Sequence, residues 1–472
     1  MAALELVLYA LFLLVTGLAV WRRPVAALFL FVVGLALHNA VMAALYGAGV
    51  RGSTLTAITA WKEVLLVVAL ARVSADAFRA RRLPFDWSVV DWLALAFAAL
   101  CVVYALIPQS ALGGDAGHRA VALGLRHDVV PVGAYFLGRA LALTREQWRA
   151  LAWTLLGTAA AVAAWGLIDV YAIPISWWRA SAVVPYFRSH LGYHYNGTGH
   201  LPENFIYNVG GDKPFLRRLV STYLSPLASG YLFVVALLVA SRWRRVAIAL
   251  SVVVFAGLLW TFSRSSLVAL AVGLVVLACV CRRRLALFGA AALVIAVAVG
   301  WAHLFPHIAP TGHFTQADLR FQHSQAHKGP KTAFCAVCSN EPSLHEHWLA
   351  LKQGVHTVAH HPQGYGLGNV GQVASRTATP PKAGESNYTE LGVELGLLGS
   401  LLWIAWGLAI FVALVRARSF RIAAAFAAVL ALAVQTDVIG DPWVAYCVWG
   451  LAGAGMLRTR LQEGLAADPV PA

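Results

Sequence analysis

Long apolar runs separated by short polar segments fill most of the chain. Thirteen such runs can be distinguished, and most approach the roughly 20 residues that a helix needs to cross a bilayer. They cover residues 4–21, 25–47, 54–76, 87–107, 121–141, 148–172, 220–241, 246–262, 265–281, 286–305, 390–415, 420–437 and 442–457. This pattern predicts an all-α, polytopic membrane protein with thirteen transmembrane helices, or twelve if the first run lies in the membrane interface. We expect the first run to be retained rather than cleaved as a signal peptide.

The arginines predict how these helices are oriented. Clusters such as Arg22–Arg23 and Arg282–Arg284 fall in alternate loops, and the positive-inside rule makes those loops cytoplasmic. The two longest loops, at about 174–219 and 306–389, are then predicted to be periplasmic, and the C-terminus cytoplasmic. Long loops usually carry function, so we expect the site on the outer face. The chain divides into residues 1–219 (N-terminal helices and first outer loop), 220–305 (central helices), 306–389 (large outer loop) and 390–472 (C-terminal helices and tail).

Composition supports the membrane interpretation and narrows the function. Hydrophobic residues make up 60% of the chain and charged residues 12%, against about 45–50% and 25% in soluble domains. The mean hydropathy is +0.70. The net charge of +15 is explained by topology, and no basic–aromatic pattern indicates a nucleic-acid partner. Glycine patterns typical of ATP or dinucleotide sites are absent, so no cofactor is expected.

Three arginines stand against the positive-inside bias. Arg217 and Arg218 close the first outer loop, and Arg264 lies in a very short outer turn, "TFSRSSLVAL". A guanidinium stays charged in a low-dielectric site and binds phosphate oxygens bidentately. The three therefore indicate an anionic lipid headgroup, such as a diphosphate, at the outer leaflet. The alternative is ordinary interfacial anchoring.

The second outer loop ends in a glycine-rich turn and an acidic helix start. The turn reads "HPQGYGLGNVG", and the next apolar run begins "ESNYTELGVELGLLG". This places Glu385, Glu390 and Glu394 at the mouth of a membrane helix, where acids are costly and usually functional. Glu385 is the candidate general base, Glu394 is expected to have a structural partner, and Glu390 is left undecided. The alternative for Glu385 is a helix-start acid favoured by the helix dipole.

These pieces together resemble a known family. "RRLVSTYLSPLASGY", "TFSRSSLVAL", "HPQGYGLGNVG" and "ESNYTELGVELGLLG" occur in the order typical of the bacterial O-antigen ligase/polymerase family. The resemblance covers about residues 217–415. It implies transfer of a glycan from an undecaprenyl-diphosphate carrier to a hydroxyl of the lipid A core or of another glycan, at the periplasmic face of the inner membrane. It further implies inversion at the sugar and no requirement for a metal.

The resemblance also implies roles for residues. Arg218 and Arg264 would hold the diphosphate, and Pro226 would shape the start of its helix. Ligases of the family have a His just before the Asn of the last motif, whereas this chain has Glu385 and Ser386 there. Glu385 therefore replaces that His as the candidate base, and ligase and polymerase both remain open. The further candidate substrate-binding residues are Arg217, Arg126, Tyr223, His361, Gly366, Gly368, Asn387 and Tyr388.

Two other features leave alternatives open. Polar residues within apolar runs, Lys62–Glu63 and Arg126–Asp128, are also compatible with a transporter of lipid-linked sugars. In the second outer loop, Cys335 and Cys338 lie among His323, His327, His345 and His347. This spacing fits a structural zinc site, a disulfide, or neither. No metal is assigned to the reaction.

Overall fold

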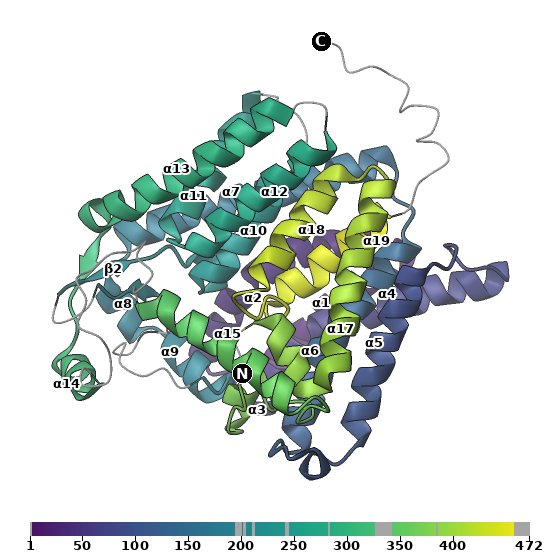
Figure 1. Cartoon of the computed structure of the whole chain (residues 1–472), viewed down its shortest axis with the longest axis horizontal. Coiled ribbons are helices and arrows are strands. Elements are labelled where there is room, and N and C mark those ends of the chain that lie inside the picture. The colour runs from purple at the N-terminus through teal and green to yellow at the C-terminus, as the bar shows by residue number, and fades with distance from the viewer. Residues whose placement is uncertain are drawn as a thin grey trace.

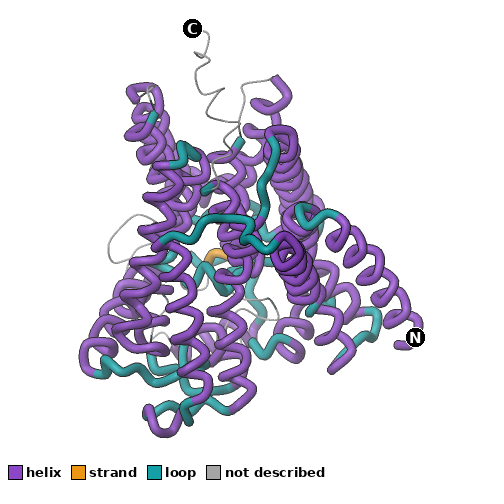
Figure 2. The backbone as a smooth tube through the Cα atoms, turned by 90° about the vertical axis from the view of Figure 1, so that its right-hand side faces the viewer, coloured by secondary structure: helices purple, strands orange, loops and turns teal. Residues whose placement is uncertain are grey.

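The computed structural model describes residues 2–193, 201, 204–209, 213–240, 245–281, 284–325, 342–383 and 386–456. Helices form most of this backbone (Figure 1), with only short strands among them (Figure 2). Seven candidate spans are long and apolar enough to cross a membrane: Glu5–Arg22, Ala26–Gly47, Gly52–Ala80, Val89–Leu106, Arg145–Ala172, Arg284–Ile308 and Asn387–Arg416. The prediction of an all-α polytopic membrane protein is confirmed.

Every predicted apolar run coincides with helix. The long helices are α1 (Ala2–Arg22), α2 (Ala26–Gly47), α4 (Trp61–Ala80), α5 (Val89–Leu106), α6 (His118–Ala140), α7 (Arg145–Ala172), α13 (Arg284–Ile308) and α17 (Asn387–Arg416). Shorter apolar helices are α10 (Pro226–Val239), α11 (Arg245–Trp260), α12 (Arg264–Val280), α18 (Phe420–Leu432) and η5 (Val444–Val448) with α19 (Trp449–Gly455). The remaining helical elements are α3 (Gly52–Thr59), η1 (Gln109–Leu112), α8 (Ile175–Ala180), α9 (Val183–Pro185), η2 (Tyr186–His190), η3 (Ser221–Tyr223), α14 (Gln316–Gln325), α15 (Pro342–His360) and α16 (Gly371–Thr377).

Two helix boundaries differ from the sequence prediction. The run at 220–241 becomes helical only at Pro226, because Pro is favoured in the first turn and Ser225 caps the helix by accepting a hydrogen bond from the Ala228 N–H. The run at 54–76 is divided at Ala60 into α3 and α4. The Pro226 prediction is therefore confirmed, and the predicted start at residue 220 is wrong.

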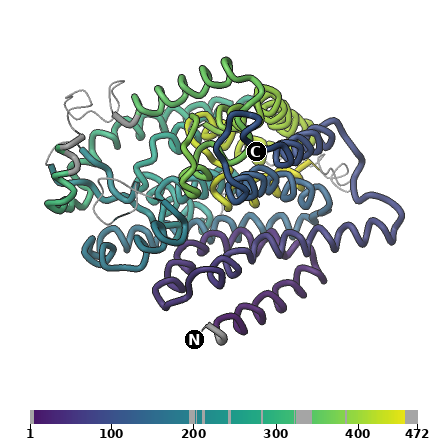
Figure 3. Tube along the Cα trace, turned by 90° about the horizontal axis from the view of Figure 1, so that it is seen from below, coloured from purple at the N-terminus to yellow at the C-terminus, as the bar shows by residue number. Residues whose placement is uncertain are grey.

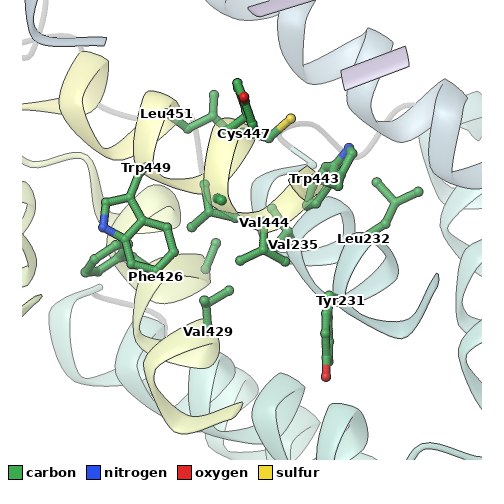
Figure 4. Packing of buried hydrophobic residues seen from close by; sticks show 14 of the residues in the cluster. Tyr231, Leu232, Val235, Phe426, Val429, Trp443, Val444, Cys447, Trp449 and Leu451 are labelled. Carbon is green, nitrogen blue, oxygen red and sulfur yellow. The ribbon is translucent and has the colours of Figure 1, made fainter. Parts of the chain in front are cut away.

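The core is built where helices approach closely. Helix α6 packs against α19, and a Cβ on Gly138 or Gly453 would lie 2.1 or 2.2 Å from a carbonyl oxygen of the other helix. The space between α10, α18 and the C-terminal η5 and α19 is filled by Trp443, Phe426 and Tyr231 (Figure 4). The Tyr231 hydroxyl points away from this cluster. Helix α1 lies at the periphery (Figure 3), with only 6% of its apolar window buried.

A three-stranded antiparallel sheet joins the two outer loops. Strand β2 (Phe215–Arg217) lies between β1 (Ile206–Tyr207) and β3 (Thr311–Gly312). Ile206 pairs with Arg217, and Phe215 pairs with Gly312. The sheet fixes the chain direction just before Arg218, so it positions that residue.

The glycine-rich turn packs against a kink in α17. Gly396 interrupts the helix with φ 72° and ψ −178°, and a Cβ there would lie 2.4 Å from the Pro362 carbonyl oxygen. The Tyr365 and Gly366 N–H groups donate to the carbonyls of Val393 and Glu394 (2.6 and 2.9 Å). The turn thereby replaces hydrogen bonds that the kinked helix cannot make for itself.

We expect Gly366→Ala to destabilise the protein by roughly 1–3 kcal/mol, the usual cost of a strained backbone site. Gly366 has φ 89°, and a Cβ would lie 1.8 Å from Oε1 of Gln109. That side chain cannot easily move, because its Nε2 donates to the carbonyls of Tyr104 and Ile107. Thermal unfolding of the purified protein measures the effect. Gly289→Ala is the control, since nothing lies within 4 Å of a Cβ at Gly289; equal midpoints for both variants would contradict the prediction.

Candidate functional site

Arg218 is held where the first outer loop meets the α11–α12 turn. Its N–H donates to the Phe205 carbonyl (3.3 Å), and the next residue, Leu219, donates to the Trp260 carbonyl (2.9 Å). The Arg218 Nε donates to the Thr261 carbonyl (2.8 Å), and only 7% of the residue is exposed. The guanidinium is thus fixed at the turn that also carries Arg264.

Arg264 begins helix α12 and places a second cation beside Arg218. The helix is capped by Ser263, whose side chain accepts from the Ser266 N–H, and the Arg264 guanidinium lies 5.8 Å from the Tyr207 ring centroid. Burial, and after it the charge of Arg264, lowers the pKa of Arg218 to about 10. Among the described residues no carboxylate pairs with Arg218. Two neighbouring cations at a helix N-terminus favour a bound anion.

Arg217 has a different environment. Its guanidinium donates to an Asp169 carboxylate oxygen (3.3 Å) and to the Val170 and Ile173 carbonyls at the end of α7. Asp169 also accepts from the Trp178 indole (2.7 Å). These contacts satisfy Arg217 within the fold, and they favour a structural role over the predicted substrate contact.

A buried cluster of acids surrounds His127. The ring Nδ1 lies 2.7 Å from Asp128 Oδ1, and Nε2 lies 3.0 Å from Asp437 Oδ2. Both contacts are hydrogen bonds when both ring nitrogens carry protons, or when one of the two carboxyl groups is protonated and donates to a neutral ring. Asn387 Nδ2 fixes Asp437 by donating to its Oδ1 (2.6 Å). In either form both ring nitrogens are engaged by carboxyl groups, so His127 has no free nitrogen to serve as a base.

The two acids of α17 differ in their partners. Glu394 Oε1 accepts from the Gly368 N–H (2.7 Å), which supports the structural role expected for Glu394. Glu390 is 6% exposed, and no hydrogen bond to its carboxylate is found in the described part of the chain. A Cβ added to Gly371 would lie 2.5 Å from Glu390 Oε1, so the glycine makes room for this carboxylate.

Two adjoining cavities open at this cluster. One, of about 260 Å³, is lined by the acids, His127 and Asn387. The other, of about 570 Å³, is lined by Lys62, Glu63, Arg126 and Arg376, and it shares His127, Gln372 and Val373 with the first. The two cavities thus place a cluster of carboxylates next to a group of cationic side chains.

The other predicted substrate contacts divide into two groups. Arg126 and Asn387 line the cavities. The remaining five positions serve the fold: His361 bonds to the Leu112 carbonyl, Tyr388 donates to the Leu430 carbonyl, Tyr223 is 2% exposed, and Gly366 and Gly368 shape the turn. None of these five residues lines either cavity.

Some predictions fall outside the described residues. Glu385, the candidate base, is one of them, and so are Cys335, Cys338 and His327 of the possible zinc or disulfide site. Within the ranges that the structure describes, no group of three or more His, Cys, Asp or Glu side chains is arranged to hold a metal ion. The alternatives for the cysteines remain open.

Sequence reasoning missed Asp437, Gln372 and Arg376. Asp437 carried a usable signal: "TDVIGDP" places two acids in a short turn between apolar runs, on the predicted outer side. Gln372 and Arg376 lie on α16, a short polar helix whose sequence resembles an ordinary surface segment.

Comparison with known protein families finds a match in the second half of the chain. Residues 249–404, about a third of the chain, match the family model described as O-antigen ligase. The matched region includes Arg264, the glycine-rich turn, Glu390 and Glu394, and it excludes Arg218, His127 and Asp437. No curated protein matches the chain.

Proposed function

We propose that the chain is a membrane glycosyltransferase of the O-antigen ligase/polymerase family, a proposal that the family match over residues 249–404 supports. The glycan is transferred from an undecaprenyl-diphosphate carrier to an acceptor hydroxyl. The observation that carries the proposal is the pair formed by the buried Arg218 and the half-buried Arg264, with no carboxylate partner for Arg218 among the described residues. Such a pair suits a diphosphate, whose oxygens match the planar guanidinium.

The reaction divides between the two parts of the site. The acceptor hydroxyl loses its proton to a carboxylate and its oxygen attacks the anomeric carbon of the donor sugar. The bond from that carbon to the diphosphate oxygen breaks, and the electron pair leaves with undecaprenyl diphosphate. Arg218 and Arg264 stabilise the departing charge, the effect that usually contributes most to catalysis. Direct displacement inverts the anomeric centre.

The proton acceptor is a carboxylate near the start of α17. We assign this role to Glu385, and Glu390 is the second candidate because it lines the cavity without a hydrogen-bond partner in the described residues. General-base catalysis contributes typically 10²–10⁴-fold. The histidines of the preceding segment are weaker candidates, since His361 is bound to Leu112 and His356 stacks on His360.

The proposed setting is the bacterial inner membrane, with the site facing the periplasm. The arginine distribution supports this orientation. The acceptor is either a lipid A core glycolipid, as in a ligase, or a second lipid-linked glycan, as in a polymerase. No metal takes part in the proposed reaction.

Transfer by the purified protein tests the proposal. The protein in lipid nanodiscs is given an undecaprenyl-diphosphate oligosaccharide and each acceptor in turn, with a chelator present. We expect a glycosylated acceptor and released undecaprenyl diphosphate in equal amounts. Failure with both acceptors, together with movement of the intact donor across proteoliposomes, would instead support a transporter.

A further inference from the structure

The larger cavity, called the chamber below, is lined mainly by positively charged side chains, whereas the adjoining cavity is lined by acids. Three cationic side chains, Lys62, Arg126 and Arg376, line it together with a single carboxylate, Glu63. The formal balance of these four groups is two positive charges. The smaller cavity next to it is lined by Asp128, Glu390, Glu394 and Asp437, so the charge changes sign at the shared residues.

Glu63 cannot neutralise the chamber. Its Oε2 lies 3.6 Å from Lys62 Nζ, and its Oε1 lies 3.2 Å from Arg126 Nε, so one carboxylate serves two cations. Lys62 is 3% exposed, and its Nζ also donates to the Thr59 carbonyl (2.7 Å). Burying an ammonium group whose only counter-ion is shared with a second cation costs free energy, and a further anion close to it would reduce that cost.

Arg376 has no acidic partner in the described part of the chain. Its Nε donates to the Leu191 carbonyl (3.0 Å), and its guanidinium lies 5.9 Å from the Tyr193 ring centroid. Tyr193 in turn donates to Gln372 Oε1 (2.7 Å). The first outer loop thus holds α16 so that Arg376 lines the chamber, while four of the five guanidinium N–H groups are not used by that one bond.

The position of the chamber assigns it to the acceptor. Arg218 and Arg264, which would hold the leaving diphosphate, line neither cavity. In a direct displacement the attacking hydroxyl approaches opposite the leaving group, so the carboxylates that take its proton lie on the acceptor side. The chamber adjoins those carboxylates through His127, Gln372 and Val373.

We propose that this chamber binds an anionic substituent, a carboxylate or a phosphate, on the acceptor glycan. The inference rests on the proposed transfer reaction and adds the chemical class of the acceptor. Arg376 and Arg126 donate to the anionic group, and Lys62 supplies a fixed positive charge beneath it. When a neutral acceptor is bound, the positive charge of the chamber has no counter-ion, so we expect a neutral acceptor to bind more weakly.

Matched acceptors test the proposal. Transfer is measured to an acceptor that carries a uronic acid and to the corresponding neutral sugar, for the unmodified protein, Arg376→Gln and Arg126→Gln. We expect each substitution to raise KM for the uronic acid acceptor roughly tenfold or more, as for loss of a charge-assisted hydrogen bond, with kcat and the donor KM little changed. Arg51→Gln, an exposed arginine whose guanidinium lies 4.5 Å from the Tyr46 ring centroid, should alter neither acceptor. Equal KM values for the two acceptors in the unmodified protein would overturn the proposal.

A binding measurement separates this proposal from the proposed transfer reaction. Calorimetric titration with methyl glucuronide and with methyl glucoside reports on the chamber without turnover. We expect weak binding of the glucuronide only, lost in Arg376→Gln. If the glucuronide binds but no transfer is observed, the anion-binding role of the chamber is kept and the proposed reaction is refuted. If transfer occurs without discrimination of charge, only the anion-binding role of the chamber is refuted. Charge discrimination that follows an acid on the donor sugar, and not on the acceptor, would refute the assignment to the acceptor.

Discussion

Arg264→Lys should lose most transfer activity, although the substitution keeps the positive charge. An ammonium is a point charge, whereas the guanidinium presents a planar fork that matches two phosphate oxygens at once. Loss of one preorganised donor to a developing negative charge costs about 10²–10³-fold in kcat. Arg218→Ala should fall by a similar factor, since its guanidinium is buried and fixed by Thr261. The measurement is kcat for release of undecaprenyl diphosphate at saturating donor.

Arg217 provides the matched control for this prediction. Arg217 is adjacent to Arg218 in sequence and is buried to the same extent. Its guanidinium, however, is satisfied by Asp169 and by the carbonyls at the end of α7. We expect Arg217→Lys to lower the thermal midpoint and to keep transfer per folded molecule within a few-fold of the unmodified protein. A fully active, normally folded Arg264→Lys protein would show that Arg264 is only an interfacial anchor.

The difference between Arg217 and Arg218 illustrates what the sequence can and cannot predict. Both arginines oppose the positive-inside bias, and that signal draws attention to the segment. It could not tell the two apart, because the distinction depends on β2 pairing with β1 and β3 and on where α7 ends. Local patterns specify the helices, whereas partners far apart in sequence decide which polar group is satisfied.

The acidic cluster also depends on partners that are far apart in the sequence. His127 and Asp437 are 310 positions apart, and nothing in the sequence around either residue indicates the other as its partner. They meet because α6 and the C-terminal helices approach at glycines such as Gly138 and Gly453. Sequence spacing did indicate Glu390 and Glu394, since they share one helix. The partner of Glu394 is Gly368, and the sequence does not indicate it because the contact depends on the glycine-rich turn packing against the kink at Gly396.

Glu385 and Glu390 are alternative positions for the base, and single substitutions distinguish them. Both changes to Gln keep the size of the side chain and remove its ability to accept a proton. If Glu385 is the base, Glu385→Asp should retain more activity than Glu385→Gln, because it keeps a carboxylate one methylene shorter. Glu385→His should restore part of the activity, since an imidazole can also accept a proton at neutral pH.

Glu385→Gln should lower the transfer rate by about 10²–10⁴-fold, the usual contribution of a general base, while donor binding is kept. Glu390→Gln should cost less than tenfold, and Glu146→Gln, an exposed acid in the first turn of α7, should cost nothing. The rates are measured in lipid nanodiscs with metal chelated and with donor affinity determined separately. If instead Glu390→Gln loses the activity and Glu385→Gln keeps it, the base lies five residues further along the chain, beside Gly371. In that case the proton leaves the acceptor inside the acidic cavity, and His127 with its two carboxyl partners becomes part of the catalytic environment.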